Sequence, residues 1–150
     1  MARLTFVRKP MPVIPEHRPM LKIAMILLVL RVCSIGGKSS LIRLHLFNWA
    51  WKDENRMKGL IHSAEKKELA IGVWGVDPAL NMGLSYAISN GLVAKQKNGS
   101  YKITTKGDEF FDDVKLTSLF EEEMKLLCQI GKKITEVMVK DVAKGWENEA

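Results

Sequence analysis

The pair Asn98-Gly99 constrains the fold more than any other feature, because it lies between two short runs of strand-forming residues. These runs are residues 92–96 and 101–104. An Asn-Gly pair between two such runs predicts a β-hairpin with a primed two-residue turn.

Helical signals flank this hairpin on both sides. Asp77 can cap a helix whose first position is Pro78, and Asn90-Gly91 can end it. After the hairpin, a second helix is predicted to contain Phe110, Phe111 and Val114. The order helix, hairpin, helix is typical of a winged helix-turn-helix domain, which we place at residues 18–115.

Three further helices and one strand are predicted upstream. Residues 20–33 are apolar nearly all round and precede two glycines, which predicts a buried helix. Ser39 or Ser40 can cap a second helix. A shorter, more polar helix is expected at residues 55–67, and a short strand at residues 69–74.

The N-terminal residues 1–17 alternate apolar residues with proline, which excludes a helix and predicts an extended arm. The arm is too apolar for a free linker, so we expect it to dock on this domain or on a partner. Its candidate partner contacts are Phe6, Val7, Met11 and Ile14.

The C-terminal residues 116–150 predict one long amphipathic helix, which begins at a capping box of Ser118 and Glu121 and continues to about Val142. Its apolar stripe either packs on the same domain or contacts another chain. The candidate partner contacts on it are Phe120, Leu127 and Ile134.

The composition suits a single α+β, mostly helical globular unit, with 47% hydrophobic and 27% charged residues among 150. Two cysteines are too few for a disulfide scaffold, and no apolar run reaches the roughly 20 residues of a membrane span. We therefore expect a cytoplasmic protein that does not enter a membrane.

The sequence offers no catalytic, cofactor-binding or metal-binding pattern. Gly37-Lys38-Ser39 lacks the earlier glycine of a phosphate-binding loop, and Ser85 follows a helix start rather than the strand of a nucleophile elbow. The three histidines stand far apart. We expect a protein that is not an enzyme and has no cofactor.

The net charge of +6 is concentrated in residues 1–75, which hold 13 Lys or Arg against 5 Asp or Glu. A basic face could contact DNA phosphates or an acidic protein, or it could merely be solvated. Its candidate residues are Lys38, Arg43, Lys52, Arg56 and Lys58, with Lys95, Lys97 and Lys102 on the hairpin.

The predicted recognition helix, residues 78–90, contains no Arg or Lys. Its outward candidates are Asn81, Ser85 and Ser89. Sequence-specific contact with a DNA major groove usually needs Arg, Lys, Asn or Gln side chains, so this helix fits a protein partner better than a DNA site.

Residues 18–19, 26–30, 39–50 and 77–115 together resemble the small middle components of ABC-three-component systems, which include the small subunit of Lamassu anti-phage systems. The resemblance implies a non-catalytic adaptor beside an SMC/Rad50-like ABC ATPase and an effector, commonly a nuclease. It also allows non-specific DNA contact through the complex. The alternative is a DNA-binding winged-helix transcription regulator.

Overall fold

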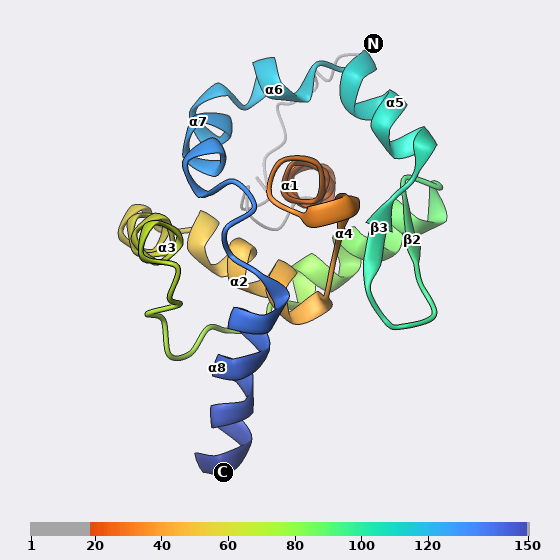
Figure 1. Cartoon of the computed structure of the whole chain (residues 1–150). Helices are drawn as coiled ribbons and strands as arrows, with labels where there is room; N and C mark the ends of the chain where they lie inside the picture. Colours follow the sequence, from red (N-terminus) through yellow and green to blue (C-terminus); the bar gives the residue numbers. More distant parts are fainter. Residues whose placement is uncertain (1–18, 150) are drawn as a thin grey trace, which may run out of the picture.

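Helix α1 (Pro19–Val32) runs through the centre of the molecule, which a computed structural model describes over residues 19–149. Figure 1 looks along this helix, and most other elements surround it. Residues 23–30 are each at most 6% exposed. A helix that is apolar on all sides needs neighbours on all sides, so the prediction of a buried first helix is confirmed.

Helices α2 (Leu41–Trp51) and α3 (Glu54–Lys66) follow, as the sequence predicts. Ser40 caps α2 by accepting a hydrogen bond from the backbone N–H of Arg43. Asp53 caps α3 in the same way through the N–H of Asn55. Each cap satisfies a backbone donor that has no partner within its helix.

The predicted strand at residues 69–74 is wrong, because residues 69–77 form neither helix nor strand. A strand needs a neighbouring strand for its backbone hydrogen bonds, and none lies beside this segment in the sheet that the structure describes. Trp74 anchors the segment instead: its Nε1 donates to the carbonyl oxygen of Ile42 at 3.0 Å. Its ring also meets that of Trp146 edge-on, with centroids 4.7 Å apart.

Helix α4 (Pro78–Ser89) has the predicted boundaries: Asp77 caps it, Pro78 occupies its first turn and Asn90 ends it. The hairpin strands β2 (Val93–Lys95) and β3 (Tyr101–Ile103) follow and pair antiparallel. The primed turn, however, is wrong. Gln96 and Ser100 are hydrogen bonded across a three-residue loop, and within that loop only Gly99 has a positive φ, at 91°.

A third strand, β1 (Lys38–Ser39), was not predicted. It pairs antiparallel with β3, which gives the sheet order β1-β3-β2. The 3₁₀ turn η2 (Ile35–Gly37) leads into it, and two glycines with positive φ turn the chain after α1. Two residues are too short a run to carry a strand pattern in the sequence.

The C-terminal region contains α5 (Thr105–Asp113), α6 (Leu116–Leu119), α7 (Glu121–Ile130) and α8 (Glu136–Glu149). The prediction of one long helix is therefore wrong. Gly131 breaks it with φ 56° and ψ −140°, and the Thr135 hydroxyl accepts the N–H of Met138 at the start of the next helix. Ser118 lies inside α6 and forms no capping box, because α7 starts without a side-chain cap.

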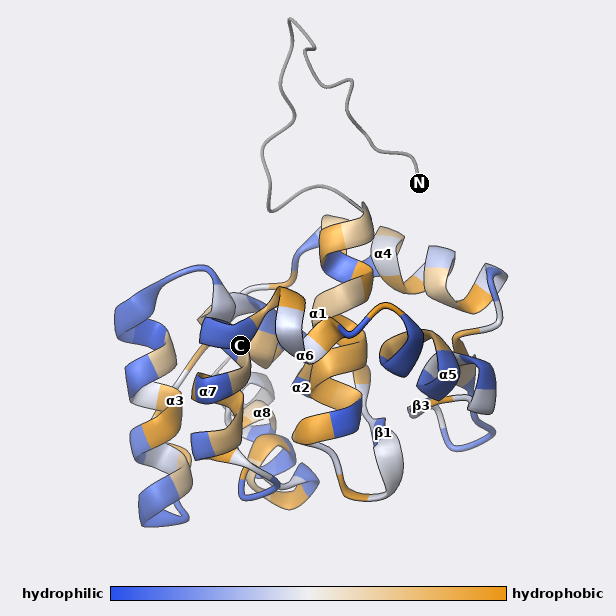
Figure 2. Ribbon diagram, turned by 90° about the horizontal axis from the view of Figure 1, so that it is seen from above, coloured by the Kyte–Doolittle hydropathy of each residue, from blue (hydrophilic) through white to orange (hydrophobic). Residues whose placement is uncertain are grey.

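The described chain is mostly helical, with one small antiparallel sheet, as expected of an α+β protein. Leu127, Ile130, Ile134 and Val139 are fully buried in the same hydrophobic core as α1. Figure 2 shows the most hydrophobic colours on α1 and hydrophilic ones on the outer surfaces of α3 and α5. No helix of the described part combines the length and apolar character needed to cross a bilayer.

Candidate functional site

Helix α4 is held at its N-terminus by a polar cluster, the Asp77 junction, formed by Lys22, Asn48, Lys52 and Asp77. The Asp77 Oδ2 atom lies 2.7 Å from the Lys52 ammonium and 3.4 Å from that of Lys22. Asn48 donates to the same oxygen at 3.0 Å and accepts from Lys22 at 2.8 Å. The junction thereby ties α1 and α2 to the first turn of α4.

The charge of Asp77 is strongly stabilised. Burial favours the neutral carboxyl, but hydrogen bonds from Lys52, Asn48 and the Ala79 N–H outweigh burial and hold the pKa of Asp77 well below its ordinary value. Asp77 therefore remains ionised while it caps α4, and its negative charge also lies favourably at the positive end of the helix dipole.

His45 extends the junction along α2. The backbone N–H of Asp77 donates to His45 Nδ1 at 3.2 Å, which leaves the Nε2–H to donate to Asn81 Oδ1 at 3.2 Å. Burial lowers the pKa of His45 below its usual 6.5, although the Asn81 hydrogen bond and the charge of Asp77 oppose this. The imidazole is therefore neutral at physiological pH and serves as a structural link between α2 and α4.

The outward side of α4 forms a surface that we call the α4 face; it is uncharged and partly apolar. Asn81, Ser85 and Ser89 lie on it and are exposed, as the sequence indicates. Sequence reasoning missed Met82 and Tyr86, which are 55% and 46% exposed, and Ile88 at its edge, which is 39% exposed. The signal available was the spacing of 82 and 86, opposite the buried positions 80, 84 and 87.

Arg43 is buried rather than exposed on a basic face, which corrects its prediction as a nucleic-acid contact. It is 3% exposed, and its guanidinium donates to the carbonyl oxygens of Cys33 and Ile134 and to the hydroxyl of Ser34. The ring of Phe47 lies 5.0 Å away. Burial lowers the pKa of Arg43. The planar guanidinium carries five N–H donors, which lets it hydrogen bond to all three of these oxygen atoms at once.

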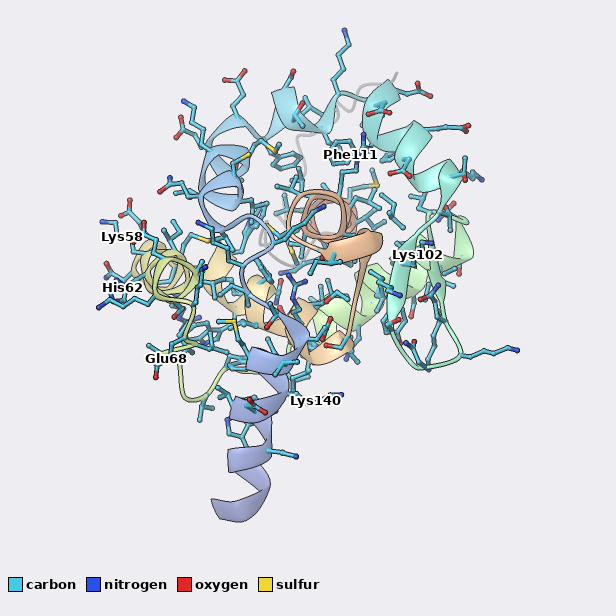
Figure 3. The ribbon with its side chains drawn as sticks, viewed as in Figure 1. Lys58, His62, Glu68, Lys102, Phe111 and Lys140 are labelled. Carbon is cyan, nitrogen blue, oxygen red and sulfur yellow. The ribbon has the colours of Figure 1, made fainter. Side chains whose placement is uncertain are left out.

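The remaining upstream cations do not form one basic face with the hairpin. Lys52 pairs with Asp77, and the Arg56 guanidinium stacks 4.6 Å above the Trp49 ring. In Figure 3, Lys58 projects from α3 on one side of the molecule while Lys102 lies on the hairpin at the opposite side. The basic residues therefore divide between separate surfaces.

The hairpin lysines do not share one face of the sheet. Lys95 pairs with Tyr101 and its ammonium lies over the Tyr101 ring, whereas Lys102 pairs with Ala94 and points to the opposite face. Lys95, Lys97 and Lys102 are all exposed, and Lys38 on β1 is the register partner of Lys102. Neither Lys38 nor Lys102 forms an ion pair with residues 19–149. Like charges directly opposite one another on neighbouring strands repel, so an anion bound over this pair would relieve the repulsion.

A basic cavity of about 540 Å³ adjoins this pair, between η2, the hairpin turn and the start of α8. Lys38, Lys132 and Lys140 line it. The Glu136 carboxylate, also in the lining, accepts the backbone N–H of Ser40 at 2.9 Å. The cavity thus extends the positive surface from the sheet to α8.

The predicted partner contacts on the C-terminal region fall into two groups. Leu127 and Ile134 are fully buried, so their proposed contact with a partner is corrected: they pack within their own chain. Phe120 is half-buried beside the exposed Leu119. The arm residues Phe6, Val7, Met11 and Ile14 lie outside the described residues.

The two cysteines differ in burial. Burial raises the pKa of Cys33 to about 12, and its Sγ lies 3.3 Å from the carbonyl oxygen of Leu127. Cys128 is exposed on α7. Within residues 19–149, no three His, Cys, Asp or Glu side chains are grouped so as to hold a metal ion.

Comparison of the chain with protein-family models, with curated proteins and with solved structures finds no match in any of the three.

Proposed function

We propose that this chain is a winged-helix adaptor without catalytic activity, which joins an SMC/Rad50-like ABC ATPase to an effector nuclease in defence against phage or plasmids. The element order α1-β1-α2-α3-α4-β2-β3 and the sheet order β1-β3-β2 support the winged-helix assignment. The chain departs from the usual pattern because α3 and the segment after it separate α2 from α4.

The α4 face is the observation that carries this proposal. In a winged helix, α4 would be the recognition helix, yet residues 78–89 contain no charged side chain. Met82 and Tyr86 instead offer exposed apolar surface in the middle of this helix. Aromatic residues and methionine are enriched in protein interfaces, whereas DNA-binding surfaces are strongly positive, so this helix suits a protein partner.

The Asp77 junction supports the same role. Its hydrogen bonds and ion pairs fix the first turn of α4 against α1 and α2, so the α4 face is held rigidly before a partner binds. Such preorganisation reduces the entropy lost on association. The proposed identity of the partners rests on the sequence resemblance.

Co-purification tests the proposal. The full chain is co-expressed with the proteins encoded beside its gene, and bound partners are identified by mass spectrometry and tested for ATPase activity. Met82→Glu with Tyr86→Ala should reduce the recovered partner at least about tenfold, because an aromatic anchor contributes about 2 kcal/mol or more.

Val137→Glu on α8 is the matched control, since Val137 is 67% exposed and lies outside the α4 face. It should leave recovery unchanged. Recovery of no partner would overturn the adaptor assignment, and a partner without ATPase activity would overturn the link to an ABC complex.

A second candidate, a DNA-binding regulator, is favoured by the opposed pair Lys38 and Lys102. The full chain alone is titrated with DNA at several salt concentrations. Replacement of Lys95, Lys97 and Lys102 by alanine should weaken phosphate contacts uniformly and make the salt dependence shallower. Tight binding to one DNA site, lost in Ser85→Ala, would favour the regulator over the adaptor.

A further inference from the structure

An open apolar groove of about 370 Å³ lies between the start of α1 and the helices α5 and α6. We call it the α1–α6 groove; its lining is apolar throughout and includes Leu21, Phe110, Leu116 and Phe120. At its edges, Met20 is 65% exposed and Leu119 is 66% exposed. Large apolar side chains gathered around a hollow in this way indicate a docking site.

The groove opens where the N-terminal arm joins the domain. Met20 and Leu21 line it, and Pro19 begins α1 directly after residues 1–18. Met11 precedes Pro19 by eight residues, which can span at most about 28 Å. A tethered segment meets its site at an effective concentration in the millimolar range, so even weak apolar contacts suffice for docking.

The chemistry of the arm matches the groove. The arm carries Leu4, Phe6, Val7, Met11, Val13 and Ile14. Its prolines lie among these residues and restrict the conformations of the chain before docking. Proline-rich segments bind apolar grooves at low entropic cost for this reason.

Charge supplies an independent argument. Residues 1–18 contain four Arg or Lys and one Glu, a net charge of +3, although the chain as a whole is also basic. Residues 105–125, which include the groove residues Phe110, Leu116, Leu119 and Phe120, contain seven Asp or Glu and three Lys, a net charge of −4. Arg31 pairs with Asp108 and Asp112, which leaves this side of the groove with a net charge of −3. Opposite fields of this kind orient a docking segment and lower the energy of the docked state.

We propose that apolar side chains of residues 4–14 dock in the α1–α6 groove of the same chain. Docking covers Met20 and Leu119 and holds the arm along the acidic side of the domain. This inference concerns the folded state of the chain itself and is independent of the adaptor proposal.

Limited proteolysis of the full chain tests the docking. The Arg8–Lys9 bond is a trypsin site within the arm, and mass spectrometry follows loss of residues 1–8 with time. Leu119→Asp places a charge in the groove and should accelerate this cleavage about tenfold or more. Met11→Ser with Ile14→Ser should accelerate it similarly while leaving residues 19–149 unaltered.

A double-mutant cycle and a control complete the test. Leu119→Asp should add little to the arm variant, because both remove the same contact. Val137→Asp, which alters an equally exposed apolar residue on α8, should not change the rate. Equal cleavage rates in the wild type, the groove variant and the arm variant would overturn the proposal.

The mass of the protein in solution distinguishes the other occupants. A monomer whose Arg8–Lys9 protection does not vary with protein concentration agrees with docking in the same chain. A dimer in which protection disappears on dilution would overturn it in favour of an arm exchanged between two copies. If the arm of the wild-type protein is cleaved as fast as an unfolded peptide, the proposal is overturned, and the groove would then be a binding site for a different protein.

Discussion

Lys22 and Arg43 are both buried cations, but the protein neutralises them in different ways. The Lys22 ammonium lies beside a carboxylate, that of Asp77, and an amide oxygen. Arg43 directs its guanidinium at two backbone carbonyl oxygens and a hydroxyl group, with an aromatic ring beside it.

The difference follows from the shapes of the two cations. An ammonium is a compact charge, and its burial costs several kcal/mol unless an anion compensates it. A guanidinium spreads its charge over five donors in a plane and can be satisfied by the dipoles of several acceptors. The first junction therefore depends on charge, and the second on geometry.

The largest effect is expected for Asp77→Ala, which breaks the ion pair between Asp77 and the buried Lys22 and also removes the cap of α4. Breaking a buried ion pair from one side costs about 3–5 kcal/mol. Denaturant unfolding of the full chain measures this loss.

Asp77→Asn is the informative companion, because asparagine also caps helices well. It removes the charge and keeps the cap, so it should retain at least about 1 kcal/mol of what Asp77→Ala loses. Equal losses in the two variants would show that the charge alone supports the junction.

The next largest effect is expected for Arg43→Lys, which preserves the positive charge but removes the planar set of N–H donors. A lysine cannot reach the oxygens of Cys33, Ser34 and Ile134 together, and each buried acceptor left without a partner costs about 1–3 kcal/mol. If unfolding shows less than about 1 kcal/mol of destabilisation, charge rather than geometry governs this site.

A smaller effect is expected from pH, because the stability of the fold depends on the protonation of His45. Its pKa is lower in the folded chain than the ordinary 6.5, so the unfolded chain binds the proton more readily. Stability should therefore decrease as pH falls below about 6.5, since protonation breaks the hydrogen bond from the Asp77 N–H. Asp77, whose pKa is also lowered, adds its own loss only in stronger acid, below about 3.8.

His45→Asn should flatten the change in stability between pH 6.5 and 5, because asparagine offers an acceptor that does not titrate in this range. His62→Asn, on the exposed side of α3, is the control and should preserve the wild-type slope. Thermal unfolding of the three proteins across this pH range decides the point.

The smallest effect is expected for Lys52→Met. Lys52 also pairs with Asp77, but its side chain is 30% exposed, and ion pairs open to solvent contribute at most about 1 kcal/mol. If Lys52→Met lowers the free energy of unfolding as much as Asp77→Ala does, then the ion pair of Asp77 with Lys52, and not that with Lys22, stabilises the junction.

The sequence predicts those features whose causes lie within a few residues. Asp77, Pro78 and Asn90 mark both ends of α4 because caps and prolines act on the adjacent backbone. The position of the hairpin turn was also predicted correctly, but its type was not. Lys97 and Asn98 have negative φ values, whereas a primed turn at Asn98-Gly99 needs a positive φ at Asn98.

Features whose partners are distant in the chain could not be predicted. Arg43 looks like a surface residue in its own helix, since Ile134 lies 91 positions away. The apolar stripe of residues 120–137 continues across the break at Gly131, which hides the end of α7 from a periodicity argument. The Asp77 junction joins α1, α2 and α4, and the local sequence of each helix gives no indication that its polar residues meet those of the other two.

Because one thiol is exposed and the other is buried, the rate at which Cys33 is alkylated can report how often the hydrophobic core opens to solvent. At neutral pH a thiol reagent meets Cys128 at the surface, while Cys33 stays protonated inside the core. Cys33 becomes alkylated only when the core around α1 opens to solvent. The mass of the native chain after timed alkylation therefore reports, without any substitution, how often that core comes apart.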